Sequence, residues 1–280
     1  MEERIISEEK IDQFERFLMD EERGGNTIKK YLHDVRYFCS FCGERRIEKS
    51  IVIEYKDALS SSYTPSGANS MIAALNSFFR FLGWGDLCVK QLKVQREVYA
   101  PEEKELTRAE YERLIRCAEH QGNERISLII QTICSSGMRV SELSFVTLEA
   151  VKRGEVTVAC KGKRRVVFIV RELRKRLLSY AERRGIKAGA IFVSRSGKAL
   201  HRSNIWREMK ALCREARVCE TKVFPHNLRH LFARIFYSID KDIAKLADIL
   251  GHSSINTTRI YVMTTCTEHR RRMECMRLII

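Results

Sequence analysis

Apolar residues recur every three or four positions through the first ninety residues, with charged residues between them. The first two apolar stripes consist of Ile11, Phe14, Phe17 and Leu18, then Tyr31, Val35, Phe38 and Phe41. This period predicts two amphipathic helices, the second capped by Asn26 and Thr27. Two further helices are predicted, from about residue 50 to 59 and after the Ser/Thr/Pro/Gly connector 60–67. Four such helices make a small all-α bundle.

The pattern changes after residue 90. Residues 91–105 lose the apolar period and contain Pro101, which predicts a linker. Thr107 then begins Thr-Arg-Ala-Glu, a capping box that opens a helix. A long apolar helix follows and breaks at Ser-Ser-Gly, which ends at Gly137, before a second helix start. The β-rich runs EVTVAC and VVFIV, separated by the basic turn KGKRR, predict a hairpin.

The chain is therefore expected to be mainly α-helical with a small antiparallel β-sheet. We assign a helical N-terminal domain to residues 1–92, a linker to 93–105 and an α+β domain to 106–280. No run of about 18 apolar residues occurs, and the charged start MEERIISEEK disfavours both a transmembrane helix and a secretory signal. We expect a cytoplasmic protein with no membrane partner.

Charge is distributed unevenly along the chain. The 280 residues include 51 Lys and Arg against 36 Asp and Glu, a formal net charge of +15. Residues 1–100 hold 15 of these basic residues and 16 of the acidic ones, so the whole excess lies in residues 101–280. A polyanion, a membrane surface or solubility alone can each account for such an excess. Its concentration in one part of the chain favours contact with nucleic acid or a membrane.

Ten cysteines are spread over the chain, which favours reduced thiols over a disulfide scaffold. Cys39 and Cys42 form a Cys-x-x-Cys pair within the apolar stretch YFCSFCG. The sequence contains no second such pair and no histidine at zinc spacing from this one. We interpret the two residues as buried structural thiols rather than a metal or redox site.

The segment PHNLRHLF carries a sharper chemical signal. Pro225 favours a helix start, and His226 and Arg229 are three residues apart, so they share a helical face. His226 and His230 also have the spacing of two metal ligands. The Glu of a His-Glu-x-x-His motif is missing and no third ligand is evident, which disfavours zinc. Taken alone, the segment is better interpreted as a surface helix with polar residues near its start.

A second signal is LADILGHSSINTTRIYV. Gly251 is predicted to supply a left-handed exit from the preceding helix, with His252 in the turn. Ser253 or Ser254 can cap the next helix, which carries Tyr261 nine residues after His252. A tyrosine in such a helix is ordinarily a packing residue with its hydroxyl at the surface.

Four separated motifs together resemble the tyrosine recombinases, also called the phage integrase family. In the family's order they are SSGMRVSEL, ACKGKRRVVF, HNLRH and LGHSSINTTRIY. The resemblance implies a catalytic set of Arg139, Lys161, His226, Arg229, His252 and the nucleophile Tyr261. The hairpin departs from the family's Gly-Lys-Gly-x-Lys, because Cys160 replaces the leading Gly and Phe168 stands where Pro is common. Lys163 therefore remains an alternative to Lys161.

The chemistry that the resemblance implies suits these residue types. Arg139 and Arg229 would hold the attacked phosphate, since guanidiniums stay charged and donate in a fixed fork. A tyrosine has a pKa near ~10, so His226 would act as its acid/base partner. The hairpin lysine would protonate the departing 5′ oxygen, while His252 would bond a non-bridging oxygen or help to position Tyr261. The resulting 3′-phosphotyrosyl link keeps the energy of the phosphodiester, so no ATP, metal or other cofactor is expected.

The resemblance also makes double-stranded DNA the expected partner, which gives the basic surplus a use. The N-terminal domain would be the family's SAM-like core-binding domain. The DNA-binding residues expected over the two domains are Lys29, Lys30, Arg36, Lys163, Arg164 and Arg165. A homotetramer on DNA is implied, joined by the tail after Tyr261, which ends in the apolar cluster Met276, Leu278, Ile279 and Ile280. An accessory DNA-bending or directionality protein and association with a bacterial-type nucleoid fit the same family.

The leading interpretation is a compact, Xer-like site-specific recombinase that exchanges DNA strands through a Holliday junction. One alternative is a topoisomerase IB-like nicking-closing enzyme, which the two-domain length and the motif series disfavour. The other is a DNA-binding regulator that has lost catalysis, which the intact catalytic set disfavours. Integration, excision, inversion and dimer resolution all share this chemistry.

Overall fold

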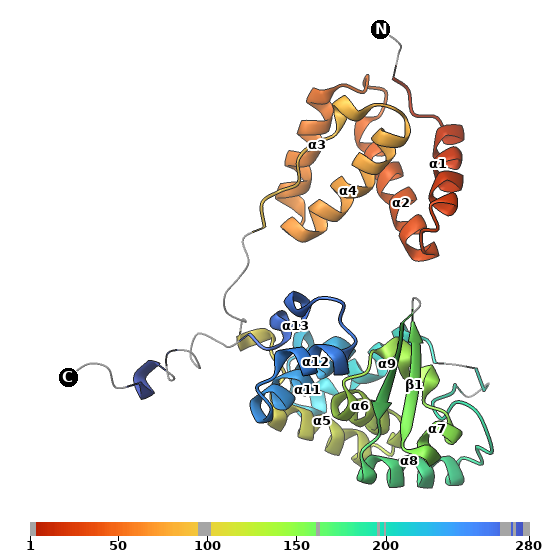
Figure 1. The fold of residues 1–280 in the computed structure, drawn as a ribbon, viewed down its shortest axis with the longest axis vertical. Coiled ribbons are helices and arrows are strands. Elements are labelled where there is room, and N and C mark those ends of the chain that lie inside the picture. Colours follow the sequence, from red (N-terminus) through yellow and green to blue (C-terminus); the bar gives the residue numbers. More distant parts are fainter. Residues whose placement is uncertain are drawn as a thin grey trace. The chain divides into compact units, whose positions relative to one another are not determined.

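The computed structural model describes residues 4–94, 102–160, 163–194, 197–198, 200–263, 270 and 273–276. The chain divides into two compact units, residues 1–96 and residues 97–280 (Figure 1). Both are built mainly from helices, and the described residues contain one two-stranded antiparallel sheet. The expected fold class is thereby confirmed. No helix within the described ranges is long and apolar enough to cross a bilayer.

Unit 1 is a bundle of four helices. They are α1 (Glu8–Asp20), α2 (Gly25–Cys42), α3 (Lys49–Ser62) and α4 (Pro65–Phe81), followed by a short 3-10 turn, η1 (Gly85–Leu87). The apolar stripes of the four helices meet in one core, in which Phe14, Phe38 and Phe78 have no exposed surface. Phe14 packs edge-on against Phe78 with ring centroids 5.0 Å apart, which adds aromatic contact energy to the burial itself.

Two expected boundaries in unit 1 were wrong. The second helix begins at Gly25 with Gly24 as its N-cap, so Asn26 and Thr27 lie in its first turn and make no cap. The connector between α3 and α4 is shorter than 60–67, since α4 starts at Pro65 with Thr64 as its cap. Proline fits the first position of a helix because its missing N–H would have no partner there.

The Cys39/Cys42 pair lies at the end of α2. Cys42 is buried in the core of unit 1 and Cys39 is half-buried. Burial raises the pKa of the Cys42 thiol to about 11 and also raises that of Cys39. A raised pKa disfavours the thiolate that metal binding and redox exchange require. These properties support the interpretation of the pair as structural thiols.

Unit 2 is larger and encloses α6. Its helices are α5 (Arg108–His120), α6 (Glu124–Ser136), α7 (Leu148–Arg153), α8 (Arg171–Arg183), α9 (Arg202–Ala211), α10 (Cys213–Ala216), α11 (Pro225–Ile239), α12 (Ile243–Leu250) and α13 (Ile255–Tyr261), with 3-10 turns η2 (Glu102–Lys104), η3 (Val140–Phe145) and η4 (Glu220–Lys222). Figure 1 shows α6 in the interior, and α5, α8, α9 and α11 pack against it. Ile126, Ile130 and Ile133 of α6 have no exposed surface. The capping box predicted at Thr107 is present.

The hairpin differs from its expected form. Strands β1 (Glu155–Cys160) and β2 (Lys163–Phe168) pair antiparallel, with Cys160 opposite Lys163 and Val158 opposite Arg165. Lys163, Arg164 and Arg165 therefore belong to the second strand rather than to a five-residue turn. The alternation of strand side chains then turns Arg165 toward the interior beside Val167, while Arg164 stays exposed.

Helix α11 also holds the chain segment that enters unit 2. The Asn227 side-chain amide donates to the carbonyl oxygens of Lys104, at 2.9 Å, and Lys222, at 2.7 Å. Arg234, two turns along the helix, donates to the carbonyl oxygen of Leu106 and pairs with Glu105. Residues 104–106 are thus fixed to the helix that carries His226 and Arg229.

Gly137 provides a test of the packing around α6. It ends α6 in the left-handed conformation at φ +66°, and a Cβ added there would lie 2.5 Å from Cδ1 of Phe232. We expect Gly137→Ala to lower the free energy of unfolding by about 1–3 kcal/mol more than the same substitution does at a left-handed glycine with no close neighbours. Gly122→Ala is the matched control, because Gly122 has φ +68° and nothing within 4 Å of the added Cβ. Equal losses in urea unfolding would contradict the close packing of Phe232.

Candidate active site

One helical face of α11 carries three of the polar groups that the sequence singled out. Pro225 occupies the first turn, as predicted, and its fixed φ starts the helix directly before His226. His226, Arg229 and His230 follow at spacings of three and four residues, so they share a face. Arg229 lies deepest, with 1% of its surface exposed, and it is the largest fully buried side chain of the described chain.

Two helix ends surround the buried guanidinium of Arg229. It donates to the carbonyl oxygen of Gly137, at the end of α6, and to that of Leu250, at the end of α12, the latter at 2.6 Å. The last carbonyls of a helix have no partner within the helix and carry the negative end of its dipole. Gly137 and Gly251 both adopt the left-handed conformation that turns the chain away after these carbonyls. Two helix C-termini therefore neutralise part of the buried charge.

Burial and the neighbouring Arg139 lower the pKa of Arg229 to about 10. The group therefore remains charged at neutral pH. Its Nε hydrogen is buried and has no acceptor among the described residues. A buried charged donor without an acceptor leaves part of its desolvation cost uncompensated in the free protein.

Arg139 follows Gly137 at the start of the turn η3. Its Nη1 donates to Oε1 of Glu142 at 3.0 Å, and its Nη2 donates to the carbonyl oxygen of Gly251 at 3.3 Å. Its side chain is 40% exposed, whereas that of Glu142 is 3% exposed. Arg139 is thus held on its inner side and open to solvent on the other.

Glu142 links Arg139 to the hairpin. Its Oε2 accepts from Nη2 of Arg165 at 2.5 Å, and Arg165 also donates to the carbonyl oxygen of Ile249 at 2.6 Å. Gly251 has no side chain at the point where Arg165 passes, since a Cβ there would lie 2.6 Å from Cδ of Arg165. One buried carboxylate therefore ties η3, β2 and the end of α12 together.

Tyr261 is the last residue of α13, and only 6% of its surface is exposed. Its hydroxyl lies 3.2 Å from Nε2 of His226. The His230 ring stacks on the tyrosine ring with centroids 4.0 Å apart and planes 16° from parallel. Arg229 lies 6.0 Å from the centroid of the same ring. The hydroxyl is thus in the interior beside a proton acceptor, whereas an ordinary packing tyrosine would expose it.

His252 lies in the turn between α12 and α13, as predicted, and Ser254 caps α13. Its Nε2 is 3.0 Å from Nη2 of Arg229, and its Nδ1 is 2.8 Å from Oγ1 of Thr258. Because Arg229 can only donate, Nε2 is the acceptor and Nδ1 carries the proton, which Thr258 accepts. These two partners fix the tautomer and the orientation of the ring.

The side chains around Tyr261 form one cluster, and its three histidines, His226, His230 and His252, have lowered pKa values. Burial is the main cause for each, followed by Arg229 for His226 and His252 and by His226 for His230. The pKa falls to about 4 for both His230 and His252. The cluster is therefore neutral at pH 7, and His226 can accept a proton.

The structure brings together five of the six residues that the sequence assigned to catalysis, namely Arg139, His226, Arg229, His252 and Tyr261. Lys161 lies outside the described residues. Lys163, its alternative, pairs with Cys160 at the end of the hairpin next to residues 161 and 162. Among the described residues, no group of three or more His, Cys, Asp or Glu side chains could hold a metal ion.

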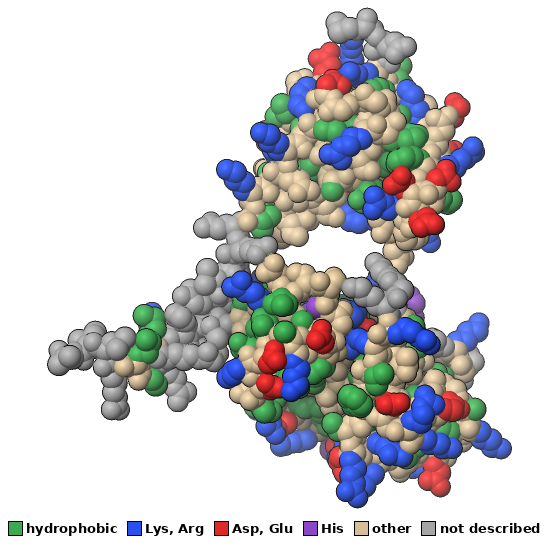
Figure 2. Space-filling view, in the orientation of Figure 1, with side chains coloured by type: hydrophobic (Ala, Val, Ile, Leu, Met, Phe, Trp, Pro, Cys, Tyr) green, Lys and Arg blue, Asp and Glu red, His purple; other side chains and the backbone are tan. Residues whose placement is uncertain are grey.

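The expected DNA-binding residues fall on both units. Lys29, on α2, and Arg164, on β2, are exposed. Lys30 pairs with the buried Asp34, and Arg36 pairs with Glu8 at 3.2 Å. Arg165, by contrast, is 14% exposed and occupied by Glu142. Figure 2 shows Lys and Arg side chains spread over most of the visible face of unit 2.

Sequence reasoning missed three residues of this site. Glu142 follows Arg139 by three residues, a spacing that signals a cap, but its second partner, Arg165, is 23 residues away. Thr258 carries no motif of its own and is identified only by its contact with His252. His230 was considered only as a metal ligand, whereas it stacks on Tyr261.

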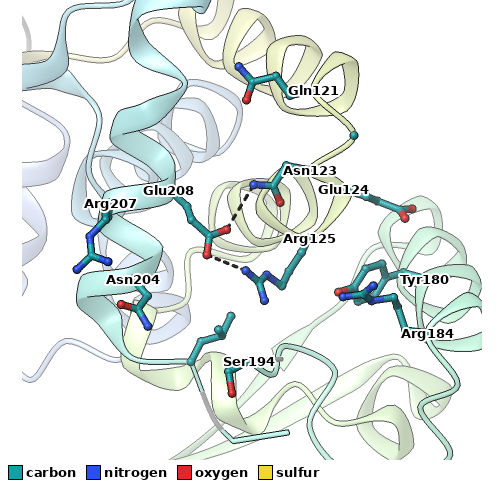
Figure 3. A pocket seen from close by; sticks show the side chains of 12 residues that line it. Gln121, Asn123, Glu124, Arg125, Tyr180, Arg184, Ser194, Asn204, Arg207 and Glu208 are labelled. Carbon is teal, nitrogen blue, oxygen red and sulfur yellow. Dashed lines mark hydrogen bonds and ion pairs between the residues drawn. The ribbon is translucent and has the colours of Figure 1, made fainter. Parts of the chain in front are cut away.

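A separate hollow lies at the opposite end of α6 (Figure 3). Gln121, Arg125, Tyr180, Asn204 and Glu208 are among the residues that line it. Arg125 donates to Oε1 of Glu208 at 2.7 Å, so the charges at its centre compensate each other. α6 has 13 residues, which separates this hollow from Gly137 by about 20 Å at ~1.5 Å per residue. The hollow is therefore distinct from the Tyr261 cluster.

The fold is mainly helical, and its site places a tyrosine hydroxyl beside a neutral histidine and a buried guanidinium. A nucleophile, a proton acceptor and a fixed positive charge are the groups that suit phosphodiester chemistry. Comparison with known families agrees with this class of chemistry. Residues 104–268 match the phage integrase family, and residues 11–85 match the phage integrase N-terminal SAM-like domain. The chain therefore belongs to the phage integrase family, the tyrosine recombinases, whose members are site-specific DNA recombinases.

Curated relatives extend over nearly the whole chain. The tyrosine recombinase XerA of Thermococcus kodakarensis is 30% identical over 97% of this chain and 96% of its own length. The tyrosine recombinase XerC of a Roseiflexus species is 29% identical over 90% of this chain and 88% of its own length. The family assignment thus applies to both units.

Solved structures share the fold. A crystal structure of XerA recombinase matches with a TM-score of 0.56 and 26% identity, covering 98% of this chain and 99% of that one. XerH recombinase bound to its difH substrate before cleavage matches with a TM-score of 0.67 and 19% identity over 96% of this chain and 85% of that one. A lambda integrase tetramer bound to a Holliday junction matches with a TM-score of 0.73 and 15% identity, covering 91% of this chain and 76% of that one.

The lowered histidine pKa values predict how stability depends on pH. A group whose folded pKa lies below its unfolded value of ~6.5 binds more protons when unfolded, so stability falls as the pH is lowered from about 6.5 to about 4. We expect this loss to be smaller in His230→Phe than in the natural chain. His120→Phe is the control, because His120 is exposed on α5.

Urea unfolding at pH 7, 5.5 and 4.5 measures the loss. In a Trp84→Phe background the signal of Trp206, the other of the two tryptophans, reports on unit 2. Equal pH slopes in the His230 and His120 variants would show that the buried His230 contributes nothing to this dependence.

Proposed function

We propose that the chain cuts and rejoins DNA by transferring a strand to Tyr261. The tyrosine oxygen attacks the phosphorus, a 3′-phosphotyrosyl bond forms, and the bond from phosphorus to the 5′ oxygen breaks. The phenol proton passes to Nε2 of His226, and the departing 5′ oxygen takes a proton from the hairpin lysine, Lys161 or Lys163. The contact of 3.2 Å between the hydroxyl and Nε2 of His226 is the observation that carries this proposal.

The two arginines would bind the non-bridging oxygens of the phosphate. Arg139 is exposed on one side and anchored by Glu142 on the other, so it can grip an anion without first changing its rotamer. Arg229 has an unpaired Nε hydrogen and already holds its charge close to Tyr261. A site in which these donors are fixed before the substrate arrives stabilises the charge that develops in the transition state. His252, oriented by Thr258, would help to position the reacting groups.

Rejoining reverses the same steps. A 5′-hydroxyl from another strand attacks the phosphorus and gives its proton to the hairpin lysine. The bond from phosphorus to the Tyr261 oxygen breaks, and that oxygen takes back the proton held by His226. The covalent bond conserves the free energy of the original phosphodiester, so the exchange requires no ATP. Two successive exchanges between two sites would form and resolve a Holliday junction.

Binding to duplex DNA would use both units. We assign residues 1–92 to the core-binding domain, 93–105 to the linker and 106–280 to the catalytic domain. Lys29 and Arg164 are exposed and available to phosphates, whereas Lys30 and Arg36 would exchange carboxylate partners for them. Lys163 would add a further contact. Arg165 acts in our proposal through Glu142 and Arg139 rather than on DNA.

Assembly on DNA would join four copies through their C-terminal tails. Met273 and Met276 are each 59% exposed, and the sequence ends in further apolar residues at 278–280. An exposed apolar cluster of this kind favours a protein partner. We propose that the tail docks on a neighbouring copy, as part of a nucleoid-bound complex to which an accessory DNA-bending or directionality protein can be added.

Trapping of the covalent complex tests the chemistry. Nicked duplexes that carry the DNA sites occupied by the protein in cells release the short strand after cleavage, so the adduct accumulates. We expect an adduct with the natural chain and less than about one-thousandth of its rate with Tyr261→Phe. Tyr237→Phe, which removes another hydroxyl of unit 2, is the matched control.

The same experiment separates the alternatives. Absence of an adduct with the natural chain would leave only a DNA-binding regulator. An adduct accompanied by relaxation of supercoiled DNA, but without exchange between two sites, would favour a nicking-closing enzyme.

Deletion of residues 273–280 tests assembly. We expect single-site binding to change by less than about twofold and assembly of two-site complexes to fall about tenfold or more, because each tail would link neighbouring copies. Native gels and sedimentation on DNA measure the two quantities. A Gly/Ser segment of equal length is the control for chain length, and unchanged assembly with both variants would refute tail exchange.

A further inference from the structure

We propose that His230 is a positioning residue that holds the ring of Tyr261 by stacking under it. The inference rests on the proposed role of Tyr261 as the nucleophile and adds a residue that the family's six catalytic positions do not include. His230 would touch neither the phosphate nor the leaving oxygen. It would act only through the orientation of the tyrosine.

The geometry of the three histidines around Tyr261 distinguishes their roles. His230 covers the flat face of the ring, with centroids 4.0 Å apart and planes at 16°. His226 approaches at 74° with centroids 5.2 Å apart, and His252 at 55° with centroids 4.9 Å apart. Among these three ring contacts, the parallel one limits tilting of the ring over its whole area. The two inclined contacts limit its position within the plane.

The orientation of this ring has a direct chemical consequence. The hydroxyl is at the far end of the side chain, so a small tilt of the ring moves the oxygen away from His226 and from the line of attack. A displacement of about 1 Å in a reacting group can cost roughly a hundredfold in rate. Because Tyr261 ends α13, it has no following helical turn to support it from the C-terminal side.

His230 is itself well held. It lies in the middle of α11, four residues after His226, and its ring packs at 68° against that of His226 with centroids 4.8 Å apart. Tyr261 also packs in a small apolar cluster with Ala233 and Leu250. Within the described part of the chain, the His230 ring makes these ring contacts and no hydrogen bond. A histidine without polar partners is better suited to stacking than to proton transfer.

Burial is the main reason why His230 stays uncharged. Burial, together with His226, Arg234 and Arg229 on α11 and His252 in the turn before α13, lowers its pKa to about 4. A proton on His230 would therefore add a cation to a site that already holds two arginines. At neutral pH the ring is a flat, uncharged surface against the tyrosine.

Two substitutions separate stacking from any role of the ring nitrogens. His230→Phe keeps a flat aromatic ring and removes both nitrogens, whereas His230→Leu keeps an apolar side chain without a flat face. We expect His230→Phe to retain most of the single-turnover rate of adduct formation on nicked duplexes and His230→Leu to lose about tenfold or more. Affinity for the uncleaved duplex should stay unchanged in both, and the pH profile of His230→Phe should follow that of the natural chain. His120→Leu is the control for loss of a histidine elsewhere in unit 2.

A second measurement does not depend on activity. In the full chain labelled with 3-fluorotyrosine, the ¹⁹F signal of Tyr261 is identified by its loss in Tyr261→Phe. We expect this signal to shift strongly in His230→Leu, which removes the ring current of the stacked imidazole, while far-UV circular dichroism confirms that the variant is folded. If the natural chain forms no adduct but this shift occurs, the proposed reaction fails and the stacking role stands.

Two results would overturn the inference. Equal loss of rate in His230→Phe and His230→Leu would show that a ring nitrogen is required. A natural rate and an unshifted Tyr261 signal in His230→Leu would show that the stacked ring does not position the tyrosine.

Discussion

The burial of a permanently charged guanidinium is the constraint around which unit 2 is built. Removal of Arg229 from water would cost several kcal/mol if the protein offered no compensation. The compensation comes from carbonyl oxygens at the ends of α6 and α12 rather than from a carboxylate. Both helices must therefore end at the same point beside α11. The left-handed glycines that end them are required for the same reason, because they expose the last carbonyls and turn the chain aside.

Because Arg229 is compensated by carbonyl oxygens, the site keeps a net positive charge. Arg139 and Arg165 share a single buried carboxylate, Glu142, whereas Arg229 is held by helix ends, whose dipoles contribute only partial charges. A carboxylate opposite Arg229 would have stabilised the free protein but competed with a phosphate. The three cluster histidines remain neutral in this field, which keeps one of them able to accept a proton. The proposed phosphate binding and proton transfer would both depend on the same excess of positive charge.

The sequence predicted what local patterns determine. The apolar period located the helices, and Pro225, Gly251 and Thr107 marked their ends correctly because each acts within one turn of its own position. The cap at Asn26 failed because Gly24 and Gly25 allow the helix to begin earlier. The basic run after Cys160 was interpreted by composition as a turn, whereas pairing with β1 draws it into a strand.

The interior of the site was less accessible to sequence reasoning. Motif order identified Arg229 and Tyr261, but nothing local indicates that one is almost fully buried or that the other turns its hydroxyl inward. Glu142 of η3 pairs with Arg165 of β2, 23 residues along the chain, and His230 stacks on Tyr261, 31 residues along the chain. Such contacts depend on how the helices pack. They follow from the sequence only through the whole fold.

The attachment of residues 104–106 to α11 has a mechanical consequence. Asn227 and Arg234 lie on the same helix as His226 and Arg229, so residues 104–106 are fastened to the helix that carries these two side chains. Any tension transmitted along the chain at this point would reach the side chains around Tyr261 through a single helix. The route by which the polypeptide enters unit 2 is therefore also a route by which force would reach that site.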